Sequence, residues 1–184
     1  MTTLREIYNN HSEQGDVGFG DKGNLHSYIE VYEDLLKPYR EKDITIMEIG
    51  IAHGHSMRMW GEYFTKGKIV GTDIWNGFDK KQFEDPKFTI IIADSGKQEL
   101  EDRLGDLTFD IIIDDASHKL EDQVFAFRTI SHRVKPGGLY IIEDAGLNPE
   151  SIALFNSLHP NCEIQDRSKV KGLWNDTLVI YRFA

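Results

Sequence analysis

The sequence predicts an α/β protein with a doubly wound, mostly parallel seven-stranded sheet, and three observations support this fold. From residue 44 onward, short apolar runs alternate with amphipathic stretches of helical length, which is typical of βαβ units. The runs are rich in β-branched residues and bounded by turn residues, as buried parallel strands are. The last two runs lie too close together for a helical crossover and therefore predict an antiparallel C-terminal hairpin. This pattern is Rossmann-like, with helices on both faces of the sheet.

The predicted elements follow one another in a regular order. A helix over residues 28–39 has apolar residues at helical spacing and stops at Pro38. Seven strands are then predicted at residues 44–50, 68–74, 88–94, 109–115, 138–144, 163–167 and 177–183. The chain has 184 residues, of which 40% are hydrophobic, and contains no linker or repeat, so we expect one domain over 1–184. In it, 1–43 would be an N-terminal loop and helix, and 44–184 an α/β core.

Composition narrows the partners and the compartment. The formal net charge of -10 argues against binding to nucleic acid or to an anionic membrane, because those surfaces attract clustered lysine and arginine. No apolar run approaches the roughly 20 residues of a membrane span. Cys162 is the only cysteine, so an intrachain disulfide and a thiolate metal site are excluded. We expect a cytoplasmic protein with no nucleic-acid or membrane partner.

A glycine turn after the first strand indicates a ligand site. Gly50 and Gly54 permit a tight turn and close approach of the backbone to a ligand. The third glycine of the G-x-G-x-x-G dinucleotide pattern is absent, which favours a group smaller than a pyrophosphate. Asp73 ends the second strand, where a carboxylate can accept ribose hydroxyls. The sequence thus favours a nucleoside ligand, the alternative being that all three residues serve only the local turns.

Two other segments leave alternatives open. Asp94 and Ser95 close the third strand and could contact an adenine ring or cap the next helix, and helix capping is favoured for Ser95. The glycine-rich loop at residues 15–24 could fold over a ligand or could be mobile.

Acidic pairs end the fourth and fifth strands. Asp114-Asp115 and Glu143-Asp144 follow apolar runs, and His118 comes one helical turn after Asp115. Acids ending neighbouring parallel strands can converge on one cation, and hard oxygen donors favour Mg²⁺ or Mn²⁺. Because side chains alternate across a strand, each pair should diverge unless the backbone turns, and Asp114 is assigned to the cofactor side or the scaffold. The alternative is that the acids cap helices and His118 lies on the surface.

Aromatic residues near the same end of the sheet could wall a pocket. Trp75, Phe78 and Trp174 are candidates, although core packing is the more common role for each. Two polar segments, 76–87 and 168–175, are predicted to be irregular loops that determine substrate specificity.

These motifs resemble a known family. Residues 44–184 resemble a class I S-adenosylmethionine-dependent methyltransferase. They contain, in this order, Glu48-x-Gly50-x-x-x-Gly54, Asp73, Asp94 and Asp114, followed by the closing hairpin. A finer resemblance is to the macrocin- and mycinamicin-type sugar O-methyltransferases. It rests on Asp21-Lys22-Gly23-x-x-His26-x-Tyr28, upstream of the predicted sheet, and on Ser56-Met57-Arg58-Met59-Trp60 after the first strand. The similarity covers nearly the whole chain. The glycine turn is poorer in glycine than is usual for that group, and its larger members carry an additional N-terminal domain.

The resemblance implies a reaction and its residues. Methyl would pass from S-adenosylmethionine to a hydroxyl of a sugar or glycosylated small molecule, with Mg²⁺ or Mn²⁺ bound by Asp115, Glu143 and Asp144. His118 would be the catalytic base beside Asp115. The implied cofactor-binding residues are Glu48, Gly50, Gly54, Ser56, Asp73, Asp94, Ser95, Asp114, Lys22 and Tyr28. A catechol acceptor, or a cofactor-binding module without catalysis, are the alternatives, and the sequence leaves open whether the chain forms a homo-oligomer.

Overall fold

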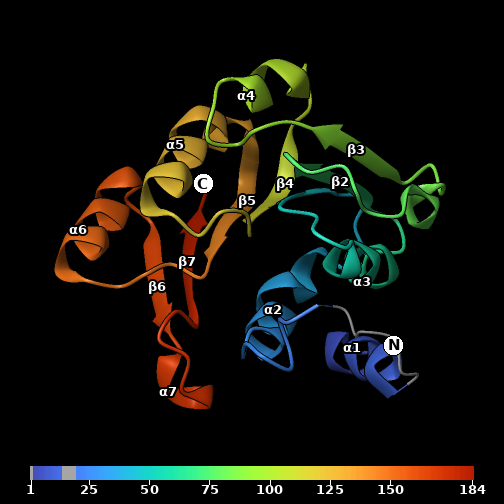
Figure 1. Ribbon diagram of the computed structural model, residues 1–184, viewed down its shortest axis with the longest axis horizontal. Coiled ribbons are helices and arrows are strands. Elements are labelled where there is room, and N and C mark those ends of the chain that lie inside the picture. The colour runs from blue at the N-terminus through green and yellow to red at the C-terminus, as the bar shows by residue number, and fades with distance from the viewer. Residues whose placement is uncertain (1, 14–19) are drawn as a thin grey trace.

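The computed structural model describes residues 2–13 and 20–184 and contains one seven-stranded sheet (Figure 1). The strands are β1 (Thr45–Ile49), β2 (Lys68–Asp73), β3 (Phe88–Ile92), β4 (Phe109–Asp114), β5 (Val134–Glu143), β6 (Cys162–Asp166) and β7 (Thr177–Arg182). They are arranged in the order β3-β2-β1-β4-β5-β7-β6. Strands β1 to β5 run parallel, and β7 pairs antiparallel with both β5 and β6. The predicted fold class, including the antiparallel C-terminal hairpin, is confirmed.

Helices cover both faces of the sheet (Figure 1). The helices are α1 (Leu4–Glu13), α2 (Ile29–Leu36), α3 (His55–Tyr63), α4 (Glu99–Leu104), α5 (Leu120–Ile130), α6 (Pro149–Leu158) and α7 (Ser168–Lys171). Residues of α1, α2 and α3 share one hydrophobic cluster with Ile111 and Ile113 of β4, while residues of α4, α5 and α6 share another with Ile112. Because both faces of β4 are buried, its central run Ile111–Ile113 is continuously apolar rather than alternating, as expected of a central parallel strand.

The order of the strands places a crevice beside β1. Strand β1 lies between β2 and β4, and the helices that follow β1 and β4, α3 and α5, pack on opposite faces of the sheet. The connections after these two strands therefore diverge, which is the topological switch point where ligands bind in open α/β sheets. Backbone pairing persists to the edge of the crevice, where the Asp115 amide donates to the Ile49 carbonyl at 2.9 Å.

Several local predictions need correction. The expected helix over 28–39 is α2 followed by a 3₁₀ turn, Lys37–Tyr39, that includes Pro38. Strand β5 begins at Val134 rather than residue 138. The supposedly irregular loops contain a 3₁₀ turn, Lys80–Phe83, and the short helix α7. Ser95 does not cap α4, because Gln98 directly precedes that helix.

Among the described residues, no helix is both long and apolar enough to cross a membrane. Helix α1 packs on α2 and α3, and its residues Leu4, Ile7 and Tyr8 belong to the hydrophobic cluster that they share with these helices. The part of the glycine-rich loop at residues 15–19 lies outside the described residues. The described part, from Gly20 onward, lies over the carboxyl ends of β4 and β5, as the contacts below show.

Candidate active site

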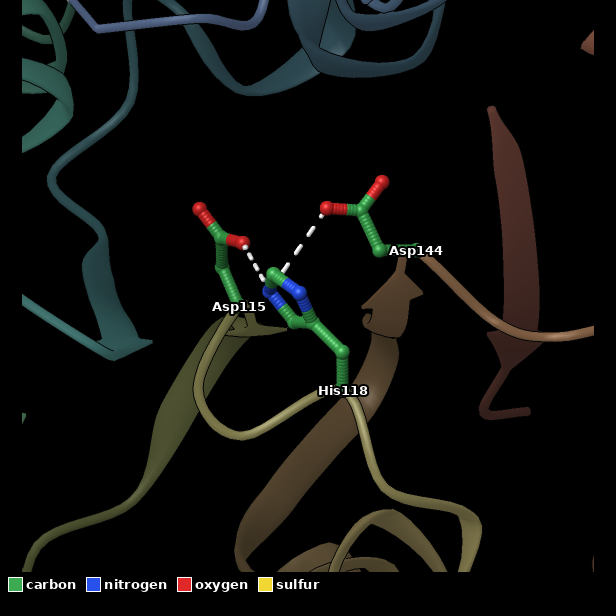
Figure 2. Close-up of side chains that lie close together, drawn as sticks. All are labelled: Asp115, His118 and Asp144. Carbon is green, nitrogen blue, oxygen red and sulfur yellow. Dashed lines mark hydrogen bonds and ion pairs between the residues drawn. The ribbon is translucent and has the colours of Figure 1, made fainter. Parts of the chain in front are cut away.

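Asp115, His118 and Asp144 converge at the carboxyl end of the sheet (Figure 2). The His118 Nε2 atom lies 3.1 Å from Asp115 Oδ1 and 3.5 Å from Asp144 Oδ2. One side-chain ligand atom from each of these three residues lies within 4.8 Å of the other two, which is close enough for the three to bind one cation. Neither acid caps a helix, since α5 follows Lys119 and α6 is capped by Asn148. The helix-capping alternative is therefore excluded.

Unusual backbone conformations shape this site. Ala52, His118 and Asp144 have positive φ angles of 45°, 56° and 53°, and they are the only non-glycine residues with positive φ in the part of the chain that the structure describes. Each such conformation costs on the order of 1–3 kcal/mol and persists only where the surrounding structure imposes it. At Asp144 the turn overrides the alternation of side chains along β5, so that Glu143 and Asp144 both reach the N-terminal segment.

A buried lysine from that segment lies among the acids. Lys22 Nζ is 2.5 Å from Asp115 Oδ2, 2.7 Å from Glu143 Oε1 and 3.4 Å from Glu48 Oε1. Glu48, Asp115 and Glu143 form a second group compact enough for a cation. Lys22 and Glu48 are both predicted cofactor-binding residues, and the structure brings them together with Asp115 and Glu143, two of the predicted metal ligands.

Tyrosine hydroxyls complete the set of contacts to the acids. Tyr28 donates to Asp144 Oδ1 at 2.7 Å, and Tyr32 donates to Glu143 Oε1 at 2.6 Å. His26 Nδ1 lies 3.3 Å from the same Asp144 oxygen. Tyr28 was a predicted cofactor residue, whereas Tyr32 and His26 had no predicted role. His26 stands in the motif upstream of the sheet, and Tyr32 lies on the apolar face of a predicted helix. A tyrosine on such a face can donate a buried hydrogen bond or simply pack in the core, and the sequence does not distinguish the two roles.

Three carboxyl groups, those of Glu48, Asp115 and Glu143, share the single ammonium group of Lys22. Burial raises the pKa of Glu48, and burial together with the charge of Asp115 raises the pKa of Glu143 well above its ordinary value. Burial acts in the same direction on Asp115, but the attraction of Lys22 and the hydrogen bond with His118 outweigh it and hold the pKa of Asp115 below its ordinary value. Because buried charge is costly unless it is paired, Glu48 and Glu143 hold protons unless a further cation pairs with them.

His118 is held near the acids by the same charge pattern. Its hydrogen bond with Asp115 raises the pKa of His118 above its ordinary value, against the opposing effect of burial. The imidazole is also partly accessible to solvent, with 39% of the side chain exposed. A histidine in this position can exchange a proton with a bound molecule.

A cavity of about 470 Å³ lies at the switch point and is bounded by four predicted cofactor residues: Gly50, Asp73, Asp94 and Ser95. Asp73 Oδ2 accepts from the Ile51 and Ala52 amides at 2.8 and 2.9 Å, and its Oδ1 accepts from the Trp75 amide at 2.8 Å. A carboxylate has about four acceptor positions, so one remains for a ligand hydroxyl.

A larger cavity of about 740 Å³ adjoins the first. It is lined by parts of three segments, residues 20–25, 50–56 and 115–118, and Gly50 and Asp115 border both cavities. Lys22 and Ser56 line the larger cavity, and Ser56 also donates to Glu48 at 2.7 Å. Gly54, with a φ of 83°, caps the start of α3.

Asp114 and Glu48 lie apart from both cavities. Neither borders them. Asp114 is on the sheet face of Ile112 and Tyr140, and burial raises its pKa to about 7. This placement agrees with the scaffold alternative for Asp114.

Only one of the three aromatic candidates is buried. Phe78 is buried, as core packing predicts, but the core prediction is wrong for Trp75 and Trp174, which are 45% and 77% exposed. Phe78 packs on Trp75 and Phe83 in edge-to-face contacts.

Comparison with known proteins identifies the family. A methyltransferase domain matches residues 47–145, more than half of the chain. The chain belongs to this family. Two relatives are an 8-demethyl-8-alpha-L-rhamnosyl tetracenomycin-C 2'-O-methyltransferase of Streptomyces olivaceus, 38% identical over 67% of the chain, and a demethylmacrocin O-methyltransferase of Streptomyces fradiae, 37% identical over 66%. The chain spans about a third of the length of each, 34% and 32%.

A solved structure confirms the fold. MycE methyltransferase from the mycinamycin biosynthetic pathway, in complex with Mg and SAH, superimposes with a TM-score of 0.74 at 24% identity, over 96% of this chain and 54% of MycE. The predicted similarity to class I methyltransferases of the macrocin and mycinamicin type is thereby confirmed.

Proposed function

We propose that this protein is a metal-dependent O-methyltransferase that transfers methyl from S-adenosylmethionine to a hydroxyl of a sugar or glycosylated small molecule. The observation that carries the proposal is the convergence of Asp115, His118 and Asp144 beside the cavities at the switch point. The relatives support the acceptor class, because one is named for methylation of a rhamnosyl group at O-2' and another for methylation of demethylmacrocin.

The nucleoside of the cofactor fits the smaller cavity. Asp73 offers its remaining acceptor position to the ribose, and Asp94 and Ser95 line the same space. Gly50 lets the backbone approach closely, because it has no side chain and a φ of 97°. S-adenosylmethionine, when bound, supplies a methyl group on a positively charged sulfur and needs little further activation.

The acids fit a hard divalent cation. Asp115 and Asp144 offer oxygens on either side of His118, and we propose them as ligands of Mg²⁺ or Mn²⁺. Glu143 remains a predicted third ligand, with Oε1 engaged by Lys22 and Tyr32. When bound, such a cation lowers the pKa of an adjacent hydroxyl.

His118 completes the proposed chemistry. With Nε2–H donating to Asp115 Oδ1, the neutral imidazole would accept the acceptor hydroxyl proton at Nδ1 as the bond from oxygen to the methyl carbon forms and the bond from carbon to sulfur breaks. Asp115 stabilises the resulting imidazolium, since its Oδ1 lies 3.1 Å away. Alignment of the acceptor oxygen, the methyl carbon and the sulfur contributes much of the rate.

We also propose the cytoplasm as the compartment, in keeping with the single cysteine.

Methyl transfer from labelled S-adenosylmethionine tests the proposal directly. Glycosides with free sugar hydroxyls and catechols are offered as separate acceptor pools, each with and without a chelator. We expect product from the glycoside pool that disappears with chelator and returns with Mg²⁺ or Mn²⁺. Product from catechols alone would assign the catechol reaction. Cofactor binding that is indifferent to chelator, with no product from either pool, would indicate a binding module and contradict the proposal.

Asp73→Asn is expected to weaken binding of S-adenosylhomocysteine by at least tenfold. One carboxylate oxygen becomes an NH₂ group, which cannot accept from a backbone amide or a ribose hydroxyl. Isothermal titration calorimetry measures the change. Asp79→Asn is a matched control, because Asp79 also accepts from a backbone amide, that of Lys81 at 3.0 Å, but lies outside both cavities. Equal affinities for both variants would contradict the assignment of Asp73.

A further inference from the structure

Each of the three predicted metal-binding acids has one oxygen engaged by the N-terminal segment. Lys22 bonds to Asp115 Oδ2, Tyr28 bonds to Asp144 Oδ1, and both Lys22 and Tyr32 bond to Glu143 Oε1. All three donors come from residues 22–32, whereas the acids follow or end strands β4 and β5, about 90 to 120 residues later in the chain. The N-terminal segment thus contacts the acids from one side.

The other oxygens of two acids face the opposite side. Asp115 Oδ1 and Asp144 Oδ2, the oxygens without a contact to Lys22 or Tyr28, are the ones that approach His118 (Figure 2). A carboxylate that is held at one oxygen cannot rotate freely about its terminal bond, so its second oxygen keeps a fixed direction. Partners of this kind orient metal ligands in many metal sites.

We propose that Lys22, Tyr28 and Tyr32 are positioning residues of the metal centre. Lys22 and Tyr28 each hold one oxygen of Asp115 and Asp144, so that the oxygens facing His118 converge on one cation, and Tyr32 holds Glu143 beside Asp115. This inference rests on the proposed function, because it presupposes a metal at Asp115 and Asp144. It assigns Lys22 and Tyr28 to the acids rather than to the cofactor. The N-terminal segment thereby becomes a necessary part of the metal site.

Burial supports a specific role for these donors. The side chains of Lys22, Tyr28 and Tyr32 are all essentially inaccessible to solvent, so water cannot replace the bonds they make. The Tyr28 hydroxyl is itself fixed, since it accepts from the Thr177 amide at 2.9 Å while donating to Asp144. The direction in which Asp144 presents its second oxygen is therefore set by the anchoring of Tyr28 on β7.

Substitution of the tyrosines by phenylalanine tests the proposal. We expect Tyr28→Phe and Tyr32→Phe to weaken Mn²⁺ binding by about 10- to 100-fold, as is typical when an outer partner of a metal ligand is lost. Electron paramagnetic resonance of free Mn²⁺ measures the affinity without any turnover. Calorimetry with S-adenosylhomocysteine should give an affinity within about threefold of that of the unmodified protein, because neither tyrosine lines either of the two cavities. A loss of cofactor affinity with unchanged Mn²⁺ affinity would overturn the assignment.

Two controls separate this proposal from general destabilisation and from the metal proposal itself. Tyr181→Phe removes an equally buried hydroxyl, which donates to the Phe155 carbonyl at 3.2 Å on the other sheet face, and should leave Mn²⁺ binding unchanged. Asp144→Asn should abolish Mn²⁺ binding. If the unmodified protein binds Mn²⁺ and Asp144→Asn does not, but both tyrosine variants bind as tightly as the unmodified protein, the positioning role is wrong and the metal centre stands. If the unmodified protein binds no Mn²⁺, both proposals fail. Should Tyr28→Phe not fold, Tyr32→Phe alone decides, because Lys22 still neutralises Glu143 in that variant.

Discussion

Replacement of His118 by alanine is expected to lower kcat for methyl transfer by about 10²- to 10⁴-fold, the usual contribution of a positioned general base. The imidazole lies between Asp115 and Asp144, at 3.1 and 3.5 Å, and no other histidine approaches both acids among the described residues. The smaller cavity, which we propose for the cofactor nucleoside, is lined by other residues. Affinity for S-adenosylhomocysteine should therefore change by less than about twofold, as measured by calorimetry alongside initial rates.

His132→Ala provides the matched control for this prediction. His132 is also exposed and also faces an acid, Glu101, at 3.5 Å, but it lies in the 3₁₀ turn Ser131–Arg133, at the opposite end of α5 from His118. We expect no change in kcat for this variant. Unchanged turnover in His118→Ala would rule out the base, whereas a tenfold loss of Mn²⁺ affinity in the same variant would make His118 a metal ligand instead.

The strands and the positions of the acids could be predicted because they depend on local patterns. The apolar runs of β1, β2 and β4 are long enough to specify buried strands, and parallel strands bring their carboxyl ends to one edge. Asp115 and Asp144 follow from this arrangement alone. Strand β5 was predicted too short because Pro136, Gly137 and Gly138 signal a turn, whereas in the structure the Gly137 amide donates to the Phe183 carbonyl at 2.8 Å and pairing continues.

The partners of the acids could not be predicted from local patterns. Lys22 reaches Asp115 across 93 residues of sequence, and such a contact depends on how the N-terminal segment crosses the sheet. The alternation of side chains along a strand predicted that Glu143 and Asp144 would diverge. The left-handed conformation of Asp144, which has no sequence signal because the residue is not glycine, brings both acids toward the same segment.

Gly50→Ala is expected to destabilise the protein and abolish cofactor binding. A Cβ atom at this position would lie 2.1 Å from the Asp115 carbonyl oxygen, and the φ of 97° is unfavourable for any residue with a side chain. The Asp115 carbonyl belongs to backbone that is hydrogen-bonded to β1, so it cannot move without shifting the acid. We expect S-adenosylhomocysteine affinity to fall by at least 100-fold and Mn²⁺ affinity to fall with it.

Gly172→Ala separates the cost of the positive φ from the cost of the steric clash at Gly50. Gly172 has a similar positive φ of 79°, but a Cβ there would meet no atom within 4 Å. The conformational cost alone is about 1–2 kcal/mol, which for a domain of this size lowers Tm by roughly 2–8 °C. If Gly50→Ala lowers Tm by no more than Gly172→Ala and binds the cofactor normally, close approach of the two strand ends is unnecessary. A larger loss of Tm, together with loss of S-adenosylhomocysteine and Mn²⁺ binding, would show that the glycine turn and Asp115 act as one unit. The reason is that the cavity proposed for the cofactor is bounded by the same backbone that carries Asp115.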